Sequence, residues 1–96
     1  MHLHLEDAEP LRVQYLEPFF DSFVALHDSP ETFRAFVELL DQAILQGDAV
    51  PTLENSKMRV LRTAADSGLP PLRLFFFIEH GTMKFMFVAH YQEDEP

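Results

Sequence analysis

Two apolar runs on either side of a His-Gly pair predict a β-hairpin in the C-terminal third of the chain. The runs cover residues 72–79 and 83–90 and are rich in phenylalanine and branched aliphatic residues, which favour strands. A polar residue followed by glycine between two such runs is typical of a two-residue turn. If Glu79 faces Thr82 across that turn, the register of the whole hairpin follows.

This register gives the hairpin two different faces. One face is entirely apolar, and its expected cross-strand pairs are Ile78–Met83, Phe76–Phe85, Leu74–Phe87 and Leu72–Ala89. The other face carries some polar groups, with the expected pairs Phe77–Lys84, Phe75–Met86 and Arg73–Val88, and His90 just beyond. A hairpin that is apolar on both faces belongs in the interior of a sheet. We expect its all-apolar face to lie against helices.

Apolar residues at helical spacing predict those helices in the first half of the chain. The first runs from about Glu17 to His27, with Pro18 in its first turn. The second runs from Pro30 to Gln46, where Ser29 is the expected N-cap and Gly47 the expected stop. Its expected core stripe is Phe33, Phe36, Val37, Leu40 and Ile44.

Short alternating stretches predict the remaining strands. They lie at residues 2–5, 11–15 and 57–63, while 48–56 and 64–71 contain proline and are predicted connections. The order is strand, helix, helix and three strands. We therefore predict an α+β fold, in which a two-helix hairpin packs on one face of a small, mainly antiparallel sheet.

Composition narrows the range of functions. The 96 residues are expected to form a single domain, 1–96, with a frayed acidic tail at 92–96. We see no apolar run long enough to span a membrane and no signal peptide, and the chain has no cysteine, so we expect a cytoplasmic protein. The formal net charge of −9 argues against general binding to nucleic-acid backbones and favours a basic partner.

The histidines near the N-terminus do not predict a metal site. His2 and His4 point to the same side of a strand, but no further ligands can be assigned to them. We therefore interpret them as histidines of an exposed edge strand, and we predict neither a metal nor a cofactor.

The positively charged residues are unevenly distributed. Five of the seven lie in the C-terminal half, namely Lys57, Arg59, Arg62, Arg73 and Lys84. In the register above, Arg73 and Lys84 share a face with His90 nearby. Such a cluster could hold a phosphate, with His90 as acid or base. The alternative interpretation is a solvated sheet face whose cations pair with the many carboxylates.

The order of elements resembles the RelE/ParE/HigB superfamily of bacterial and phage toxins. The similar features are a short helix ending in leucine (19–26), a Leu-Leu pair (39–40), a Met-Arg-Val-Leu-Arg strand (58–62), an arginine-containing apolar strand (72–78) and the final segment 84–91. The resemblance implies a toxin that is bound by an antitoxin and that, in the nuclease members, cleaves mRNA on the ribosome without a metal.

The resemblance also assigns roles by position. The expected catalytic residues are Arg73, His90 and Tyr91, and the expected RNA- or phosphate-binding residues are Arg59, Arg62 and Lys84. Many relatives carry a basic pair after the last strand, whereas this chain has an acidic tail. The alternative function is therefore a non-enzymatic acidic binding protein, such as an inhibitor, an immunity protein or a phage-encoded blocker, that occupies a basic partner surface. We also consider self-association into a homodimer.

Overall fold

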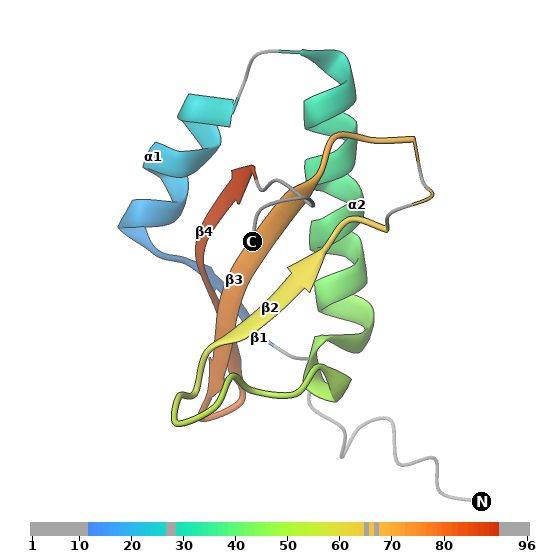
Figure 1. The fold of residues 1–96 in the computed structure, drawn as a ribbon. Helices are drawn as coiled ribbons and strands as arrows, with labels where there is room; N and C mark the ends of the chain where they lie inside the picture. Colours follow the sequence, from blue (N-terminus) through green and yellow to red (C-terminus); the bar gives the residue numbers. More distant parts are fainter. Residues whose placement is uncertain (1–11, 27–28, 65, 67, 91–96) are drawn as a thin grey trace, which may run out of the picture.

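The computed structural model describes residues 12–26, 29–64, 66 and 68–90. Its elements in chain order are β1 (Arg12–Tyr15), α1 (Glu17–Leu26), α2 (Pro30–Gln46), the 3₁₀ turn η2 (Gly47–Ala49), β2 (Arg59–Arg62), β3 (Leu72–Glu79) and β4 (Thr82–His90) (Figure 1). The predicted α+β fold is confirmed. The strand expected at residues 2–5, the last expected residue of the first helix, His27, and the tail 92–96 lie outside the described residues.

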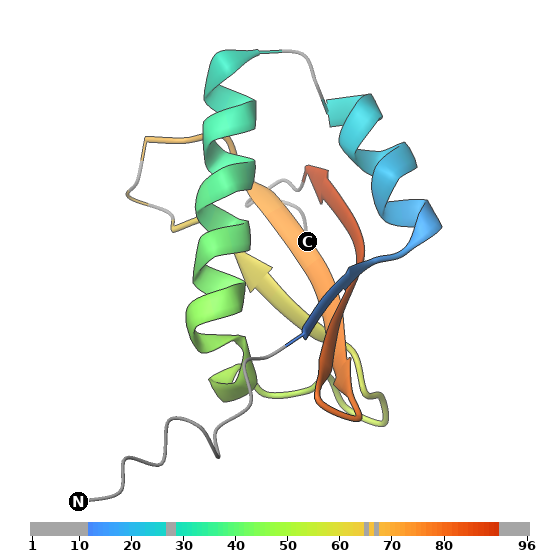
Figure 2. The ribbon, with the colours of Figure 1, turned by 180° about the vertical axis from the view of Figure 1, so that it is seen from behind.

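The four strands form one sheet in the order β1-β4-β3-β2. Neighbours β2, β3 and β4 are antiparallel, whereas β1 runs parallel to β4. Both helices lie on the same side of this sheet, α1 along β4 and α2 across β3 and β2 (Figures 1 and 2). Because β4 and β3 are the two inner strands of the sheet order, the C-terminal hairpin forms the centre of the sheet.

Helix α2 begins and ends where its local sequence predicts. The Ser29 hydroxyl accepts a hydrogen bond from the Thr32 amide at 3.1 Å, and Pro30 occupies the first turn. Gly47, however, is not a left-handed stop, because its φ of −63° is helical and the chain continues into η2. A glycine is needed there for space, since a Cβ would lie 2.7 Å from Cε of Met83 and 3.0 Å from the Phe76 ring.

The core fills the space between the helices and the hairpin. Phe76, Phe85, Leu74 and Met83 are fully buried against residues of both helices. Burial of this apolar surface is the main force that holds the helices on the sheet. Three residues of the expected core stripe are instead exposed, namely Phe33 at 45%, Ile44 at 43% and Val37 at 36%.

A serine on α1 fixes that helix to the central strand. The Ser22 hydroxyl donates to the carbonyl of Phe19 at 2.8 Å and accepts from the amide of Val88 at 3.1 Å. β1 ends opposite Phe85, so the amide of Val88 lies beyond the part of β4 that pairs with β1. Ser22 thus satisfies a strand amide that would otherwise be left without a partner.

The hairpin register is confirmed near the turn and wrong beyond Phe76. Glu79–Thr82 to Phe76–Phe85 pair as predicted, but Phe75 pairs with Phe87, not with Met86. Met86 is therefore the extra residue of a β-bulge. All later partners shift by one, giving the pairs Leu74–Val88, Arg73–Ala89 and Leu72–His90. Val88 is consequently only 2% exposed on the helix side, and Phe87 lies on the opposite side.

Candidate nucleic-acid interface

The side of the sheet that faces away from both helices carries most of the candidate chemistry. We call it the outer face. Because Leu74 and Phe76 point into the core, alternation directs Arg73, Phe75 and Phe77 the other way. Cross-strand pairing then assigns the rest of the face, which comprises Arg12, Gln14, Val60, Arg62, Arg73, Phe75, Phe77, Glu79, Thr82, Lys84, Phe87 and Ala89.

Three aromatic rings and three cations are arranged together there. The rings of Phe75 and Phe87 stack with centroids 4.3 Å apart and an angle of 21° between their planes. The guanidinium of Arg73 lies 5.5 Å from the Phe75 centroid. The ammonium groups of Lys57 and Lys84 lie 4.5 and 5.8 Å from the centroid of Phe77. Such cation–π contacts hold positive charge close to the aromatic surface.

A carboxylate at the turn end of the face pairs with both lysines. Glu79 accepts hydrogen bonds from Lys57 at 2.6 Å and from Lys84 at 3.2 Å. The hydrogen bonds from Lys57 and then Lys84 hold the pKa of Glu79 below its ordinary value. The side chains of Lys57, Lys84 and Glu79 are 60%, 26% and 34% exposed, so solvent screens the pairs and their contribution to stability is small.

The expected phosphate ligands are only partly brought together. Arg62 and Arg73 are direct cross-strand partners on the outer face, and Lys84 lies on the same face. Arg59 pairs with Phe76 and therefore lies on the helix side. Of the expected phosphate-binding residues, Arg62 and Lys84 therefore share the outer face and Arg59 does not, because residues 59 and 62 have opposite parity on the short strand β2.

Arg59 has a structural contact instead. Its Nη1 donates to the carbonyl oxygens of Val50 at 2.7 Å, Asp48 at 3.0 Å and Gly47 at 3.4 Å. These carbonyls follow the C-terminal end of α2, where backbone acceptors lack helical partners and carry partial negative charge. Arg59 thus closes the helix end, a role that only the tertiary structure reveals.

The expected catalytic residues are not assembled on one face within the described chain. The bulge pairs His90 with Leu72, which is fully buried on the helix side, so His90 belongs to that side and not to the side of Arg73. Our expectation that alternation places His90 beside Arg73 is therefore wrong. Tyr91 lies outside the described residues.

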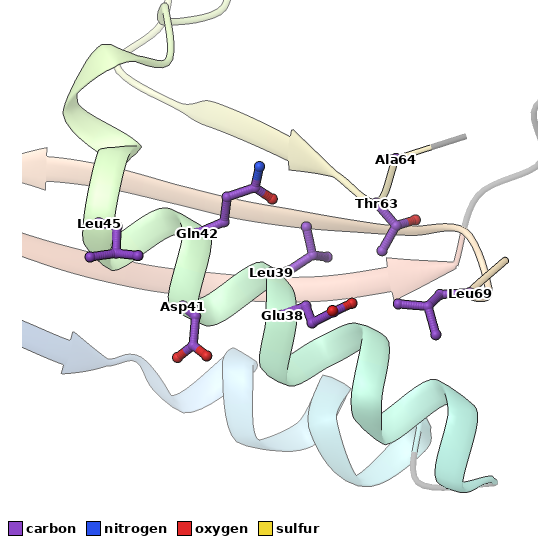
Figure 3. Close-up of a pocket in the computed structure, with 8 residues that line it drawn as sticks. All are labelled: Glu38, Leu39, Asp41, Gln42, Leu45, Thr63, Ala64 and Leu69. Atoms are coloured by element: carbon purple, nitrogen blue, oxygen red, sulfur yellow. The ribbon is translucent and has the colours of Figure 1, made fainter. Parts of the chain in front are cut away.

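A groove on the helix side was not predicted from the sequence. It has a volume of about 400 Å³ and lies between α2 and the connection from β2 to β3 (Figure 3). Its lining residues are Glu38, Leu39, Asp41, Gln42, Leu45, Thr63, Ala64 and Leu69. The sequence signal for it was the polar stretch of α2 that contains Glu38, Asp41 and Gln42.

Charge is distributed unequally between the two layers. The two helices carry five carboxylates, Glu17, Asp21, Glu31, Glu38 and Asp41, and one arginine, Arg34. The outer face, by contrast, has Arg12, Arg62, Arg73 and Lys84 with Glu79, and Lys57 lies beside it. The net charge of the chain therefore does not describe the local charge of the outer face.

Metal and membrane sites were searched over the same part of the chain. Among the described residues, no group of three or more His, Asp or Glu side chains could hold a metal ion. None of the described helices is both long and apolar enough to cross a bilayer.

No family model matches the sequence, and no curated protein matches it.

Proposed function

We propose that this chain is a RelE/HigB-like toxin component that binds single-stranded RNA on the outer face of its sheet. The observation that carries the proposal is the joint arrangement of the half-buried Phe75 and Phe87 rings with Arg73, next to Lys57 and Lys84 over the Phe77 ring. Phe77 itself is only 8% exposed, so Phe75 and Phe87 are the rings open to stacking. Aromatic rings on a sheet accept unpaired bases by stacking, and neighbouring cations contact the phosphates between them.

The charge distribution supports this proposal despite the net charge of −9. The carboxylates of the helices lie on the other side of the sheet, and Glu79 is the one carboxylate among the outer-face residues named above. RNA binding there depends on local cations and on stacking, not on the charge of the whole molecule.

Metal-independent cleavage remains a further prediction of the proposal. Arg73 can stabilise negative charge on a phosphate from its position on the outer face. An acid or base is also required, and His90 belongs to the opposite side of the sheet. RNA binding is therefore the part of the proposal that the geometry favours, and an antitoxin is the expected protein partner.

The binding experiment compares two arginine variants. We expect Arg73→Ala to weaken binding to a fluorescent single-stranded RNA. The slope of log Kd against the logarithm of salt concentration should also fall by about one, as for the loss of one phosphate contact. Arg34→Ala removes the same charge from an exposed position on α2 and serves as the matched control. Equal affinities for the two variants would contradict the proposed interface.

The same two variants test the toxin assignment in cells. Induced expression of the wild-type chain is expected to arrest growth. Arg73→Ala should relieve that arrest, and Arg34→Ala should not. RNA binding without growth arrest would retain the interface and exclude the toxin role, whereas RNA cleavage that is unchanged by Arg73→Ala would remove Arg73 from catalysis.

A further inference from the structure

The groove beside α2 combines an apolar floor with a polar rim. Leu39 is 1% exposed and forms the floor, and Leu69 from the β2–β3 connection forms the facing wall (Figure 3). Leu45, at the end nearer the C-terminus of α2, is 83% exposed, more than the other large apolar residues that the structure describes as exposed. A volume of about 400 Å³ can take one or two side chains of a partner.

The polar side chains of the rim are negatively charged or neutral. Figure 3 shows the Glu38 carboxylate extending toward Leu69 and the amide of Gln42 turned toward the strand side, whereas Asp41 points away from the strands. No Lys or Arg of the described chain forms an ion pair with Glu38, and no Lys or Arg lines the groove. The carboxylate of Glu38 is therefore available to a partner.

We propose that this groove binds a basic, amphipathic segment of a partner protein. The aliphatic stem of a Lys or Arg lies along Leu39 and Leu69, and its charged head meets Glu38. An apolar neighbour in the same segment covers the exposed Leu45. The acidic character of both helices attracts such a segment and increases its association rate.

This site is independent of the proposed RNA interface. It belongs to α2 and to the edge of the sheet beside β2, and it shares no residue with the outer face. The alternative function from the sequence was an acidic protein that binds a basic partner surface. The groove is a specific site for that binding. Failure of RNA binding would leave this inference unchanged.

A peptide titration tests the inference. The probe is a short acetylated peptide with the repeat Leu-Arg-Ser, added to the full ¹⁵N-labelled chain and followed by amide chemical shifts. A matched peptide carries glutamine at each arginine. We expect the arginine peptide to shift amides of the groove, including those of Gln42, Leu45 and Leu69, and the glutamine peptide to bind more weakly.

Two charge variants on the same helix distinguish the groove from general attraction. Glu38→Gln is expected to raise Kd for the arginine peptide about threefold to fivefold, as for a partly exposed ion pair. Glu31→Gln removes the same charge in the first turn of α2, outside the groove, and should change Kd much less. Equal effects of both variants, or no binding by the wild-type chain, would overturn the inference.

Discussion

Replacement of Phe76 by alanine tests the central packing of the fold. Phe76 is fully buried, and its ring lies 6.1 Å from that of Phe85 and close to Gly47 at the end of α2. Burial of a phenylalanine side chain contributes about 1.5–3 kcal/mol, and the cavity that remains adds to the loss. Because hairpin and helix contacts surround the ring, the cavity cannot collapse fully, and we expect a loss of about 3–5 kcal/mol.

Urea unfolding of the wild type and the variant measures this loss. A domain of this size has a total stability of roughly 5–15 kcal/mol, so Phe76→Ala should lower the midpoint strongly at an unchanged m-value. Phe20→Ala is the matched control, because Phe20 is 54% exposed and its removal should change stability far less. A loss below about 1 kcal/mol for Phe76→Ala would refute the assigned core, given the 3–5 kcal/mol typical of buried aromatic residues.

Two further predictions concern polar contacts. Arg59→Met should lower the free energy of unfolding by about 1–3 kcal/mol, because the carbonyls of Asp48 and Val50 lose the hydrogen bonds from the guanidinium. Arg34→Met is the control, and similar urea midpoints for the two variants would contradict the capping role. Hydrogen bonds from Lys57 and Lys84 lower the pKa of Glu79 in the folded state, so its contribution to stability is present above the unfolded-state pKa and is lost as the pH falls through the folded-state pKa. The difference in urea midpoint between the wild type and Glu79→Gln should therefore shrink between neutral pH and about pH 3, and a constant difference would count against the pairing.

Local signals in the sequence were sufficient for the helices and for the turn of the hairpin. The Ser29-Pro30 pair defines the start of α2, because the Ser29 hydroxyl caps the Thr32 amide and this contact depends only on neighbouring residues. The His80-Gly81 turn likewise sets the first four cross-strand pairs, and both residues have the positive φ that such a turn requires.

The bulge could not be predicted because the sequence is apolar in both registers. Phe87 and Val88 are both apolar, so exchanging which of them faces the helices does not disturb the pattern of apolar positions. The candidate site changed for this reason. A single extra residue, Met86, brought Phe87 onto Phe75 and separated His90 from Arg73. The parallel pairing of β1 with β4 and the contacts of Arg59 depend on distant parts of the chain.

The sheet order β1-β4-β3-β2 has a consequence for folding during synthesis. β1 and β2 are not neighbours in the sheet. β1 pairs with β4 and β2 pairs with β3, and both of these partner strands come later in the chain. While the ribosome synthesises the first 70 or so residues, the apolar sides of α1 and α2 have no sheet to cover. The native contacts therefore form together once the hairpin emerges, and a nascent chain arrested before β3 should be sensitive to proteases along its whole length.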